Sequence, residues 1–468
     1  MIKLYSMISH TDFTKCKQDM KYKKYLFSLS WLHSILLERR KFKTLGFNKP
    51  YDFNDSDFLI CHDLLIVLLD EYPKSTPFKA LQYLIGEANY GGRVTDEWDQ
   101  KLLGVYVETF FCEEVMQQNQ FLLSDLPEYY VPRDGNLDSY KSYIAQLPHI
   151  DDPAAFGQHP NAEISSQIEE ANSLLNTLSE LRSDRILVGG NDGNTGELII
   201  SKLDKIPGPF DVGQIESYNK RTFDPSAMKT FLLQEVQRYN CLLALLKQTK
   251  DDLHMAMKGL IVLSPQLESV MNKLVDFKVP SKWLQFYPSM KPLDSWINDL
   301  CERIKQLDQW INNETPKVFW LSGFAYPSCF LTSVLQTTAR NKGCAIDSLS
   351  WEFHLMKKGE NISARPDDGV YITGLYLEGA QWDSANGNLI EPMPMTIQSE
   401  MPIIHFKPTE TKKRNKDDMY NCPLYAYPQR AGTSQWSSFV LAVDLKRGNK
   451  SARHWAKRGV ALLLSTSE

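Results

Sequence analysis

Three motifs that mark common enzyme classes are missing from the 468 residues: the phosphate loop GxxxxGK[ST], the nucleophile motif GxSxG and the zinc motif HExxH. A phosphate loop needs backbone N–H groups freed by glycine, a lysine for the phosphates and a hydroxyl for Mg²⁺. Residues 189–196, GGNDGNTG, supply glycines without that lysine, so we interpret them as a linker. The sequence therefore predicts no ATPase motif in this chain and no catalytic, cofactor-binding or metal-binding residue.

Cysteine is sparse, with eight scattered residues and no CxxC pair, which disfavours a zinc site. The N-terminus, MIKLYSMISHTDF, lacks the basic start and apolar core of a signal peptide. Together these features favour reduced thiols in the cytosol. A thiol-protease pair such as Cys329 with His354 is disfavoured, and His405 is interpreted as a packed or half-exposed strand residue.

Strong charge asymmetry is also missing, because the net charge is only −5 in a chain that is 43% apolar and 23% charged. We therefore expect neither a nucleic-acid partner nor a membrane partner. The basic run 412–416 is followed at once by two aspartates and is interpreted as a solvated hairpin loop. The uncharged run 318–339 contains Gly323, Pro327, three serines and three threonines, which argue against a membrane span.

That uncharged run lies within residues 316–353, the stretch around which the chain is organised. Before it the sequence has mostly helical periodicity, and after it short strands and turns dominate. Trp320, between Phe319 and Leu321, is expected to be a buried core residue at this junction.

Several helices are predicted from apolar residues at spacings of three and four. The first hundred residues form a small bundle, with a connector rich in turns over 119–160 that buries its tyrosines. Ser56 or Asp57 is expected to cap the second helix, Thr95 or Asp96 the fourth, and Pro265 ends or kinks the longest. The predicted helices span 1–45, 58–71, 78–87, about 97–112, 161–182, 228–263 and 293–311.

Two of these helices carry specific predictions about their buried face. In 161–182 the inward residues are expected to be Ile164, Ile168, Ala171, Leu174, Leu175 and Leu178. In 293–311 a seam of alternating spacings predicts ordinary bundle packing. Its members are Leu293, Ile297, Leu300, Ile304, Leu307 and Ile311.

The last hundred residues have the alternation and punctuation of short strands. Strands are predicted over 370–377, 401–407, 422–427, 437–445 and 459–464. The fold class is therefore α+β, with an N-terminal helical bundle, a helical middle part and a small C-terminal β-barrel or sandwich.

Arg93 is the residue most open to a functional interpretation, because it follows Gly91-Gly92 and precedes a capped helix. An arginine there could reach a nucleotide phosphate on a neighbouring domain. An ion pair with Glu87 or Asp96 is the favoured structural alternative.

Long stretches across nearly the whole chain resemble the C-terminal end of dynein heavy chains, of the axonemal type. They are ERRKFKTLGFNKPYDFNDSD (38–57), GEANYGGRVTDEWD (86–99), KPLDSWINDL (291–300), VFWLSGFAYPSCFLT (318–332), DDGVYITGLYLEGAQWD (367–383) and HWAKRGVALL (454–463). The resemblance implies the helical small (lid) subdomain of the sixth AAA+ module over 1–118. It implies the helical part of the C-terminal domain over 119–345 and a β-barrel part over 346–468.

The resemblance also implies a function, as the non-catalytic part that braces and regulates the AAA+ ring of an ATP-driven, minus-end-directed microtubule motor in cilia or flagella. ATP and Mg²⁺ would bind in upstream modules, and Arg93 stays structural. The implied partners are the upstream ring, dynein intermediate and light chains, and the microtubule through the parent motor. The implied location is the cytoplasmic cytoskeleton, at the axoneme. The alternative is a free-standing scaffold that binds a partner through its β-barrel.

Overall fold

The computed structural model describes residues 1–183, 200–211, 213, 227–262, 264–313, 315–357, 360, 362–410, 417–432 and 438–466. Helices and strands both occur over these ranges, which confirms the α+β class. Among the described helices, none is long and apolar enough to cross a bilayer. The predicted linker 189–196 and the basic run 412–416 lie outside the described residues.

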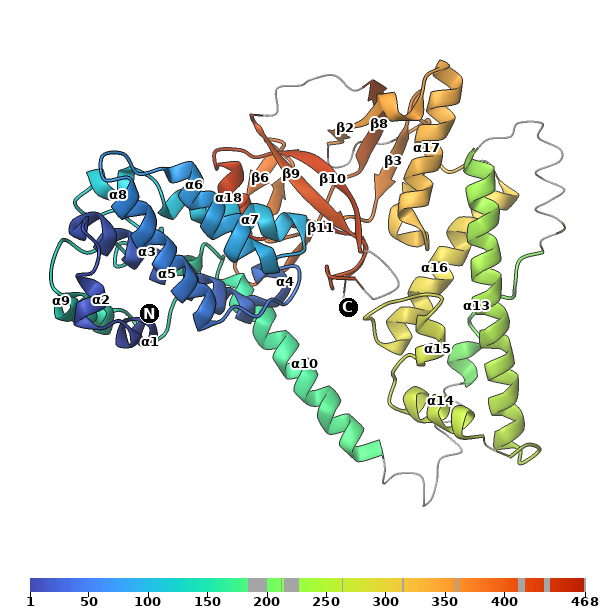
Figure 1. Cartoon of the computed structure of the whole chain (residues 1–468). Helices are drawn as coiled ribbons and strands as arrows, with labels where there is room; N and C mark the ends of the chain where they lie inside the picture. Colours follow the sequence, from blue (N-terminus) through green and yellow to red (C-terminus); the bar gives the residue numbers. More distant parts are fainter. Residues whose placement is uncertain are drawn as a thin grey trace.

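Residues from Leu4 to Ala162 share one hydrophobic core built around helix α3 (Figure 1). Helix α3 is buried on nearly every side, as the central helix of a bundle is, and its buried residues include polar ones such as Lys24 and His33. The helices of this part are α1 (Ile2–Met7), α2 (His10–Phe13), α3 (Asp19–Arg39), α4 (Lys43–Gly46), α5 (Asp55–Glu71), α6 (Phe78–Tyr83), α7 (Glu97–Phe110), α8 (Glu114–Gln117), α9 (Leu137–Gln146) and α10 (Asn161–Ser183). Single-turn elements add η1 (Arg40–Phe42), η2 (Leu84–Asn89), η3 (Gly91–Arg93) and η4 (Pro153–Phe156). We refer to residues 1–162 as the helical bundle.

The predicted first helix is wrong, because 1–45 contains four helices and the turn η1 in place of one helix. Ser9 starts a new short helix by accepting a hydrogen bond from the Asp12 N–H. The cap of α5 is also corrected: Asn54 is the N-cap, and Asp57 returns the hydrogen bond in a capping box. Asp96 caps α7, as predicted.

The third predicted helix, 78–87, changes its winding part-way along. It is α-helical to Tyr83 and continues as the π-helical turn η2, in which hydrogen bonds skip one residue more. Gly86 within this turn lies against Val107 of α7, which leaves little room for a side chain. The turn is followed by Tyr90 and then by the single-turn segment η3.

The connector 119–160 is ordered and packed, as predicted. Tyr129, Tyr140 and Phe156 are buried in the same core as α3. The core thus continues across residue 118 without interruption.

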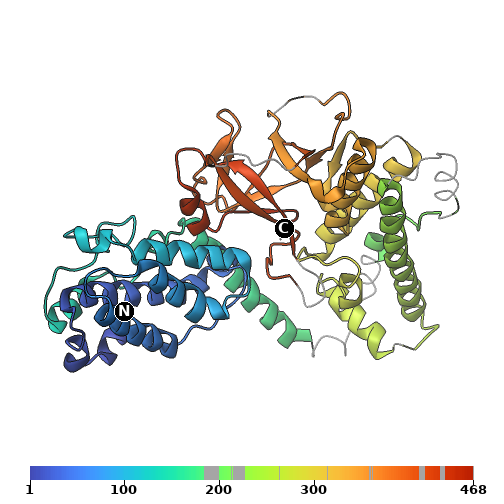
Figure 2. The ribbon, with the colours of Figure 1, turned by 45° about the horizontal axis from the view of Figure 1, so that its top comes forward.

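Helix α10 has the predicted extent, but the prediction for its buried face is wrong. Ile168, Leu174, Leu175 and Leu178 are 45%, 62%, 63% and 53% exposed, and Ala171 is also exposed. In Figures 1 and 2 this helix leaves the bundle and extends away from it. The periodicity correctly indicated a helix, although no neighbour among the described residues covers the apolar side.

A second core joins the remaining helices to the sheets, and it runs from Leu203 to Leu464. The seam predicted on α16 is buried throughout, with Ile311 the most exposed member at 9%. The longest helix ends at Met257, before Pro265, which instead opens the next helix behind the cap Ser264. These helices are α13 (Ala227–Met257), α14 (Pro265–Val275), α15 (Ser281–Leu284), α16 (Leu293–Asn312) and α17 (Pro327–Lys342), with η5 (Leu321–Gly323) and η6 (Ile346–Ser348) nearby.

The strands form a four-stranded sheet in the order β1-β3-β8-β2, a five-stranded sheet in the order β10-β9-β11-β4-β7, and the pair β5-β6. Strands β1 and β3 are parallel, as are β9 and β11, and the other pairs are antiparallel. Their bounds are β1 (Val318–Trp320), β2 (Leu349–Leu355), β3 (Val370–Thr373), β4 (Tyr376–Glu378), β5 (Gln381–Asp383), β6 (Asn388–Ile390), β7 (Gln398–Glu400), β8 (Ile404–Glu410), β9 (Met419–Tyr425), β10 (Phe439–Lys446) and β11 (Ala461–Leu463), with helix α18 (Ala452–Lys457) before β11. No closed ring of strands forms among the described residues, so the barrel stays a prediction.

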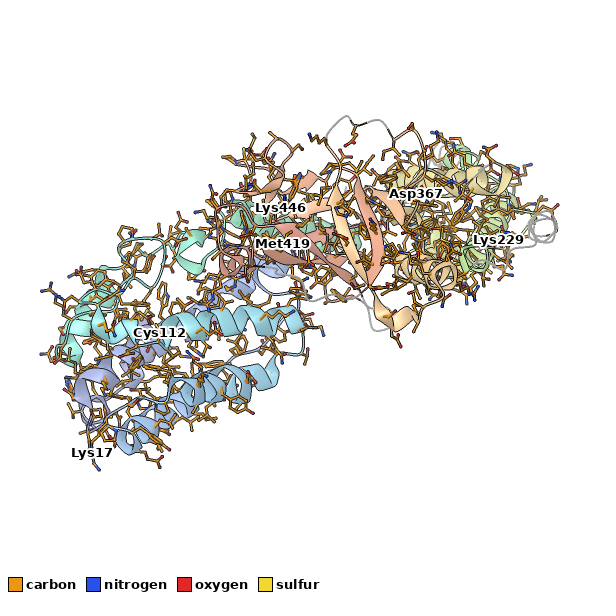
Figure 3. All side chains as sticks on the ribbon, turned by 90° about the horizontal axis from the view of Figure 1, so that it is seen from above. Lys17, Cys112, Lys229, Asp367, Met419 and Lys446 are labelled. Atoms are coloured by element: carbon orange, nitrogen blue, oxygen red, sulfur yellow. The ribbon has the colours of Figure 1, made fainter. Side chains whose placement is uncertain are left out.

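The molecule is elongated, with the five-stranded sheet between the helical bundle and the rest. Figure 3 shows Cys112 in the bundle, and Met419 with its register partner Lys446 in the middle. Asp367 and Lys229 lie toward the other end. The five-stranded sheet is thus the part of the C-terminal region that meets the helical bundle.

The predicted strand 370–377 is divided between two sheets, because β3 ends before Gly374 and β4 begins after Leu375. Gly374 has φ +76°, a left-handed conformation that favours glycine. A Cβ atom there would lie 2.2 Å from Cδ1 of Trp320, so the indole also requires a glycine. The chain bends at this point and leaves one sheet for the other.

Trp320 itself is half-buried, so the prediction that it is a core residue is wrong. Strand β1 alternates its side chains, and Phe319, 2% exposed, takes the position that points into the core. The guanidinium of Arg303 instead lies over the Trp320 indole, with Cζ 5.3 Å from the centroid of the ring. An uncharged run did not reveal which face of the strand is buried.

Candidate functional site at the bundle–sheet junction

The polar contacts between the helical bundle and the five-stranded sheet form the candidate site, which we call the junction. Its residues are buried except Lys457, which takes part through its backbone carbonyl, and their hydrogen bonds connect positions up to 418 residues apart. The junction comprises Arg39, Asn48, Asp99 and Tyr106 from the bundle, and Glu378, Tyr425, Arg430 and Lys457 from the C-terminal part.

Arg39, the last residue of α3, is fully buried and gives the junction its first link. Its Nη1 donates to the Lys457 carbonyl of α18 at 3.0 Å, to the Phe156 carbonyl at 2.8 Å and to the Tyr106 hydroxyl at 2.8 Å. Its other nitrogens donate to the carbonyls of Gly46 and Leu45 at 3.1 and 3.2 Å. Burial lowers the pKa of Arg39, while the Tyr106 hydroxyl opposes that effect. An arginine remains charged under these conditions, so the carbonyl oxygens hold a buried cation.

Asn48 provides the second link, because its side chain reaches both parts at once. Its Nδ2 donates to the Asp96 carboxylate at 2.9 Å and to the Tyr425 hydroxyl of β9 at 2.8 Å. Its Oδ1 accepts from Arg430 Nη1 at 3.2 Å. The Asn48 side chain thus connects Asp96, the N-cap of α7, with Tyr425 of β9 and with Arg430 in the loop after β9.

Arg430 and Glu378 form a buried ion pair, with 2.5 Å between Nη2 and Oε2. Each residue is only 4% exposed. Removing one member of such a pair leaves an uncompensated charge in the interior, which costs about 3–5 kcal/mol. The pair therefore fixes the position of the loop that reaches Asn48.

Asp99 of α7 anchors the loop that carries Asn48. Its carboxylate accepts from the Asn48 and Lys49 N–H groups at 2.9 and 3.2 Å, and from the Tyr51 hydroxyl at 2.8 Å. Burial raises the pKa of Asp99 to about 6 despite these three donors. The position of Asn48 therefore depends on a carboxylate that gains a proton at mildly acidic pH.

Two family models match the chain on either side of residues 163–167, and the junction connects the two matched parts. The model of the dynein heavy chain AAA lid domain matches residues 22–162, and the model of the C-terminal domain of the dynein heavy chain matches residues 168–464. The chain belongs to the dynein heavy chain family. Every bundle residue of the junction falls in the first match, and every residue from the C-terminal part falls in the second.

Curated relatives of this dynein segment are axonemal and flagellar heavy chains. The chain is 48% identical over 471 residues to "Dynein-1-beta heavy chain, flagellar inner arm I1 complex" of Chlamydomonas reinhardtii, which covers 99% of this chain and 10% of that protein. It is 47% identical to mouse and 46% to human "Dynein axonemal heavy chain 2", each over 99% of this chain and about a tenth of the relative, 10% and 11%. The chain thus spans about a tenth of the length of these relatives.

Arg93 of the dynein lid forms an ion pair, but its partner differs from both residues that the sequence suggested. Its Nη2 lies 3.0 Å from the Asp57 carboxylate of α5, rather than near Glu87 or Asp96. Asp57 also closes the capping box of α5. The contact joins η3 to the start of α5 within the lid, which is a structural use of the arginine.

The other residues singled out in the sequence do not form a reactive group. His405 of β8 is half-buried, as predicted, and its Nε2 lies 2.7 Å from the Asp368 carbonyl oxygen. His354 lies near Glu352 and His405, and no hydrogen bond among the described residues joins it to Cys329. Over the described ranges, no three His, Cys, Asp or Glu side chains come together as metal ligands.

Sequence reasoning missed the junction, although most of its residues lie in the stretches that resemble dynein. Arg39 and Asn48 lie in 38–57, Asp99 ends 86–99, and Glu378 lies in 367–383. A single sequence gives no signal that an arginine at a helix end is buried against carbonyl groups hundreds of residues away. Only the spatial arrangement relates these stretches to one another.

Proposed function

We propose that this chain is the C-terminal, non-catalytic part of an axonemal dynein heavy chain, where it braces and regulates the AAA+ ring of an ATP-driven, minus-end-directed microtubule motor. The observation that carries the proposal is the junction, because a lid held to the C-terminal domain by buried polar contacts moves with that domain. A shift of the lid during the ATPase cycle would then be passed to the C-terminal domain, and the reverse also holds.

The physical basis is that polar contacts are worth more away from water than at a surface. The side chains of Arg39 and Asn48 are buried, so little water is at hand to replace their partners when the contacts break. The lid and the five-stranded sheet therefore form one unit during small motions. The comparisons with axonemal heavy chains give no support to a free-standing scaffold.

The finer organisation is also proposed. We propose the division into 1–118, 119–345 and 346–468, with residues 119–162 packed on the lid because they share its core. We further propose that the two large sheets form an incomplete barrel. Strands β2 and β10, the edges of their sheets, are in contact, and β3 leads directly into β4.

The partners and location follow from the parent motor in the same proposal. The partners are the upstream ring, intermediate and light chains, and the microtubule through the rest of the heavy chain. ATP and Mg²⁺ bind in the upstream modules. The location is the axoneme of cilia or flagella, as part of the cytoskeleton.

The test is Asn48→Ala in the full-length heavy chain, because alanine keeps the backbone N–H that donates to Asp99 while it loses the bonds to Tyr425 and Arg430. The matched control is Arg453→Gln. Its ion pair with Glu108 also bridges α18 and α7, at 2.6 Å, but both side chains are exposed. Such a surface pair contributes about 0–1 kcal/mol.

We expect Asn48→Ala to slow microtubule gliding while ATP hydrolysis by the heavy chain persists, and Arg453→Gln to behave like the unmodified protein. Hydrogen exchange at β9 measures whether the junction has loosened. Unchanged gliding in a variant whose β9 amides exchange faster would show that the junction does not transmit motion.

A further inference from the structure

A pocket of about 270 Å³ lies beside the polar contacts of the junction, and we call it the junction pocket. One wall is formed by α7, α4 and the residues just after α4, and the opposite wall by β9, α18 and the segment before β11. Helices α7 and α18, which face each other across it, are neighbours in space (Figure 1). Asn48, Asp99 and Arg430 of the junction are also part of the lining. The pocket thus lies between two folded parts, a place where small-molecule sites often occur.

Small residues in the C-terminal part explain why the two walls do not close over this space. Ala452 and Ala456 lie four positions apart on α18, so they share one side of the helix and line the pocket with methyl groups only. Gly459 follows with φ +67°, and a Cβ atom there would lie 2.3 Å from the Leu45 carbonyl oxygen. The two parts therefore meet closely at Gly459, while the alanines leave space beside them.

The lining of the junction pocket is largely apolar and includes two aromatic rings, Trp98 of α7 and Tyr420 of β9. Leu102 and Val460, both buried, add aliphatic surface from opposite walls. The Tyr420 hydroxyl already donates to the Val460 carbonyl at 2.9 Å, so this ring offers the pocket mainly its apolar surface. Aromatic rings pack favourably against one another. Because ligand pockets usually start at about 300 Å³, the size suits a ligand of one or two rings.

The two buried charges in the lining are already engaged by the protein. The Asp99 carboxylate accepts three hydrogen bonds from the loop that carries Asn48. Arg430 forms its ion pair with Glu378. These two residues therefore add little net charge for a ligand to meet.

The two exposed charges in the lining are both positive, and they belong to Lys101 of α7 and Arg453 of α18. Their ion-pair partners, Glu97 and Glu108, are exposed and do not line the pocket. Exposed pairs of this kind are weak, and each cation has more N–H donors than a single pair uses. The Lys101 Nζ also lies 3.8 Å from the ring centroid of Trp98, which places a cation next to the aromatic surface. The rim of the pocket therefore favours an anionic group on the ligand.

We propose that the junction pocket binds a small aromatic carboxylate, with its ring between the two walls and its carboxylate at the rim beside Lys101 or Arg453. This inference concerns residues of this chain alone and does not depend on the mechanical role proposed above. A ligand that contacts both walls binds the closed junction and opposes its separation.

The test labels the full-length heavy chain with benzoylbenzoate, a photoreactive aromatic carboxylate, and identifies the labelled peptides by mass spectrometry. We expect saturable labelling of both walls, in α7 and in β9 or α18. Unlabelled naphthoate should compete with this labelling at a concentration at least about twofold lower than naphthamide, its neutral analogue, because only naphthoate carries the charge.

One pair of variants tests the contribution of the rim charges. Lys101→Gln with Arg453→Gln should abolish the preference for naphthoate over naphthamide. The matched control is Arg40→Gln with Lys41→Gln, which also removes an exposed arginine and an exposed lysine from ion pairs, but outside the pocket. This control should keep the preference.

A second pair of variants fills the pocket from opposite walls. Ala456→Leu and, separately, Val105→Phe should each abolish the labelling that naphthoate competes, because the added atoms occupy the space for the ring. Ala456→Ser, which adds a single oxygen atom, should keep the labelling. Since the two large substitutions lie in different parts of the chain, a folding defect in one does not account for the same loss in both.

Four results would overturn the proposal. They are an absence of label from the pocket in the full-length heavy chain, label confined to one wall, equal competition by naphthoate and naphthamide, and labelling that both filling variants leave unchanged.

Discussion

Replacing Arg430 by methionine tests the junction most directly, because it removes the cation of a buried pair while keeping an unbranched apolar side chain. The change leaves the Glu378 carboxylate, 4% exposed, without an opposite charge at 2.5 Å. It also removes the donor to Asn48 at 3.2 Å. Breaking a buried pair in this way costs about 3–5 kcal/mol, which is a large part of the roughly 5–15 kcal/mol that stabilises a domain.

Hydrogen exchange is the suitable assay, because it reports the free energy of local opening at individual amides. Each 1.4 kcal/mol changes the equilibrium constant for local opening about tenfold. A loss of about 3–5 kcal/mol should therefore make the amides of β9 and β11 exchange roughly a hundredfold or more faster in Arg430→Met. The Arg453→Gln control, which loses only an exposed pair, should change these rates by less than about tenfold.

The double variant Glu378→Met with Arg430→Met separates charge from packing. Replacing both partners of a buried pair by apolar groups is often nearly neutral, so slow exchange should largely return. Two results would refute the reasoning: a single variant as mild as Arg453→Gln, or a double variant that exchanges as fast as the single one.

Three further outcomes are expected. The purified chain should not hydrolyse ATP, because it contains no lysine-bearing phosphate loop; turnover that survives further purification would contradict this. Phe319→Ala should cost about 3–5 kcal/mol in urea unfolding and Trp320→Ala clearly less, because only Phe319 is fully buried; equal losses would contradict the assignment. Asp99 has a folded pKa of about 6, above its ordinary value of 3.8, so the folded protein binds its proton more tightly than the unfolded chain does. The unfolding free energy of the wild type minus that of Asp99→Asn should therefore fall as pH rises from about 4 to 6, and stay constant above pH 6; a rise across that window would contradict the pKa assignment.

Local patterns in the sequence predicted the helices well and their surroundings less well. The seam of α16 and the cap Asp96 follow from spacing and capping chemistry, which depend on neighbouring residues only. The periodicity of α10 was equally clear, yet its apolar side is exposed, because burial depends on what lies across from a helix. The same limit explains the wrong prediction for Trp320. Successive side chains of β1 point to opposite faces, and the sequence does not show which face is buried.

The candidate site was beyond sequence reasoning for a related reason. The Arg39 contact with Lys457 spans 418 positions, and the Asn48 contact with Arg430 spans 382. Polar residues in helix ends and loops are ordinarily solvated, so their types alone gave no reason to expect burial. What the sequence did provide was the family resemblance, and the junction connects the parts of the chain that the two family models match.

The bend at Gly374 has a mechanical consequence for the C-terminal part. Strands β3 and β4 belong to different sheets, yet only Gly374 and Leu375 lie between them. Two residues are too short a tether to let one sheet slide past the other. The Trp320 indole also packs against the bend, since a Cβ atom at position 374 would lie 2.2 Å from its Cδ1. A load applied to the five-stranded sheet at the junction is therefore passed through this short tether to the four-stranded sheet, and from there through β1 to the helices behind it.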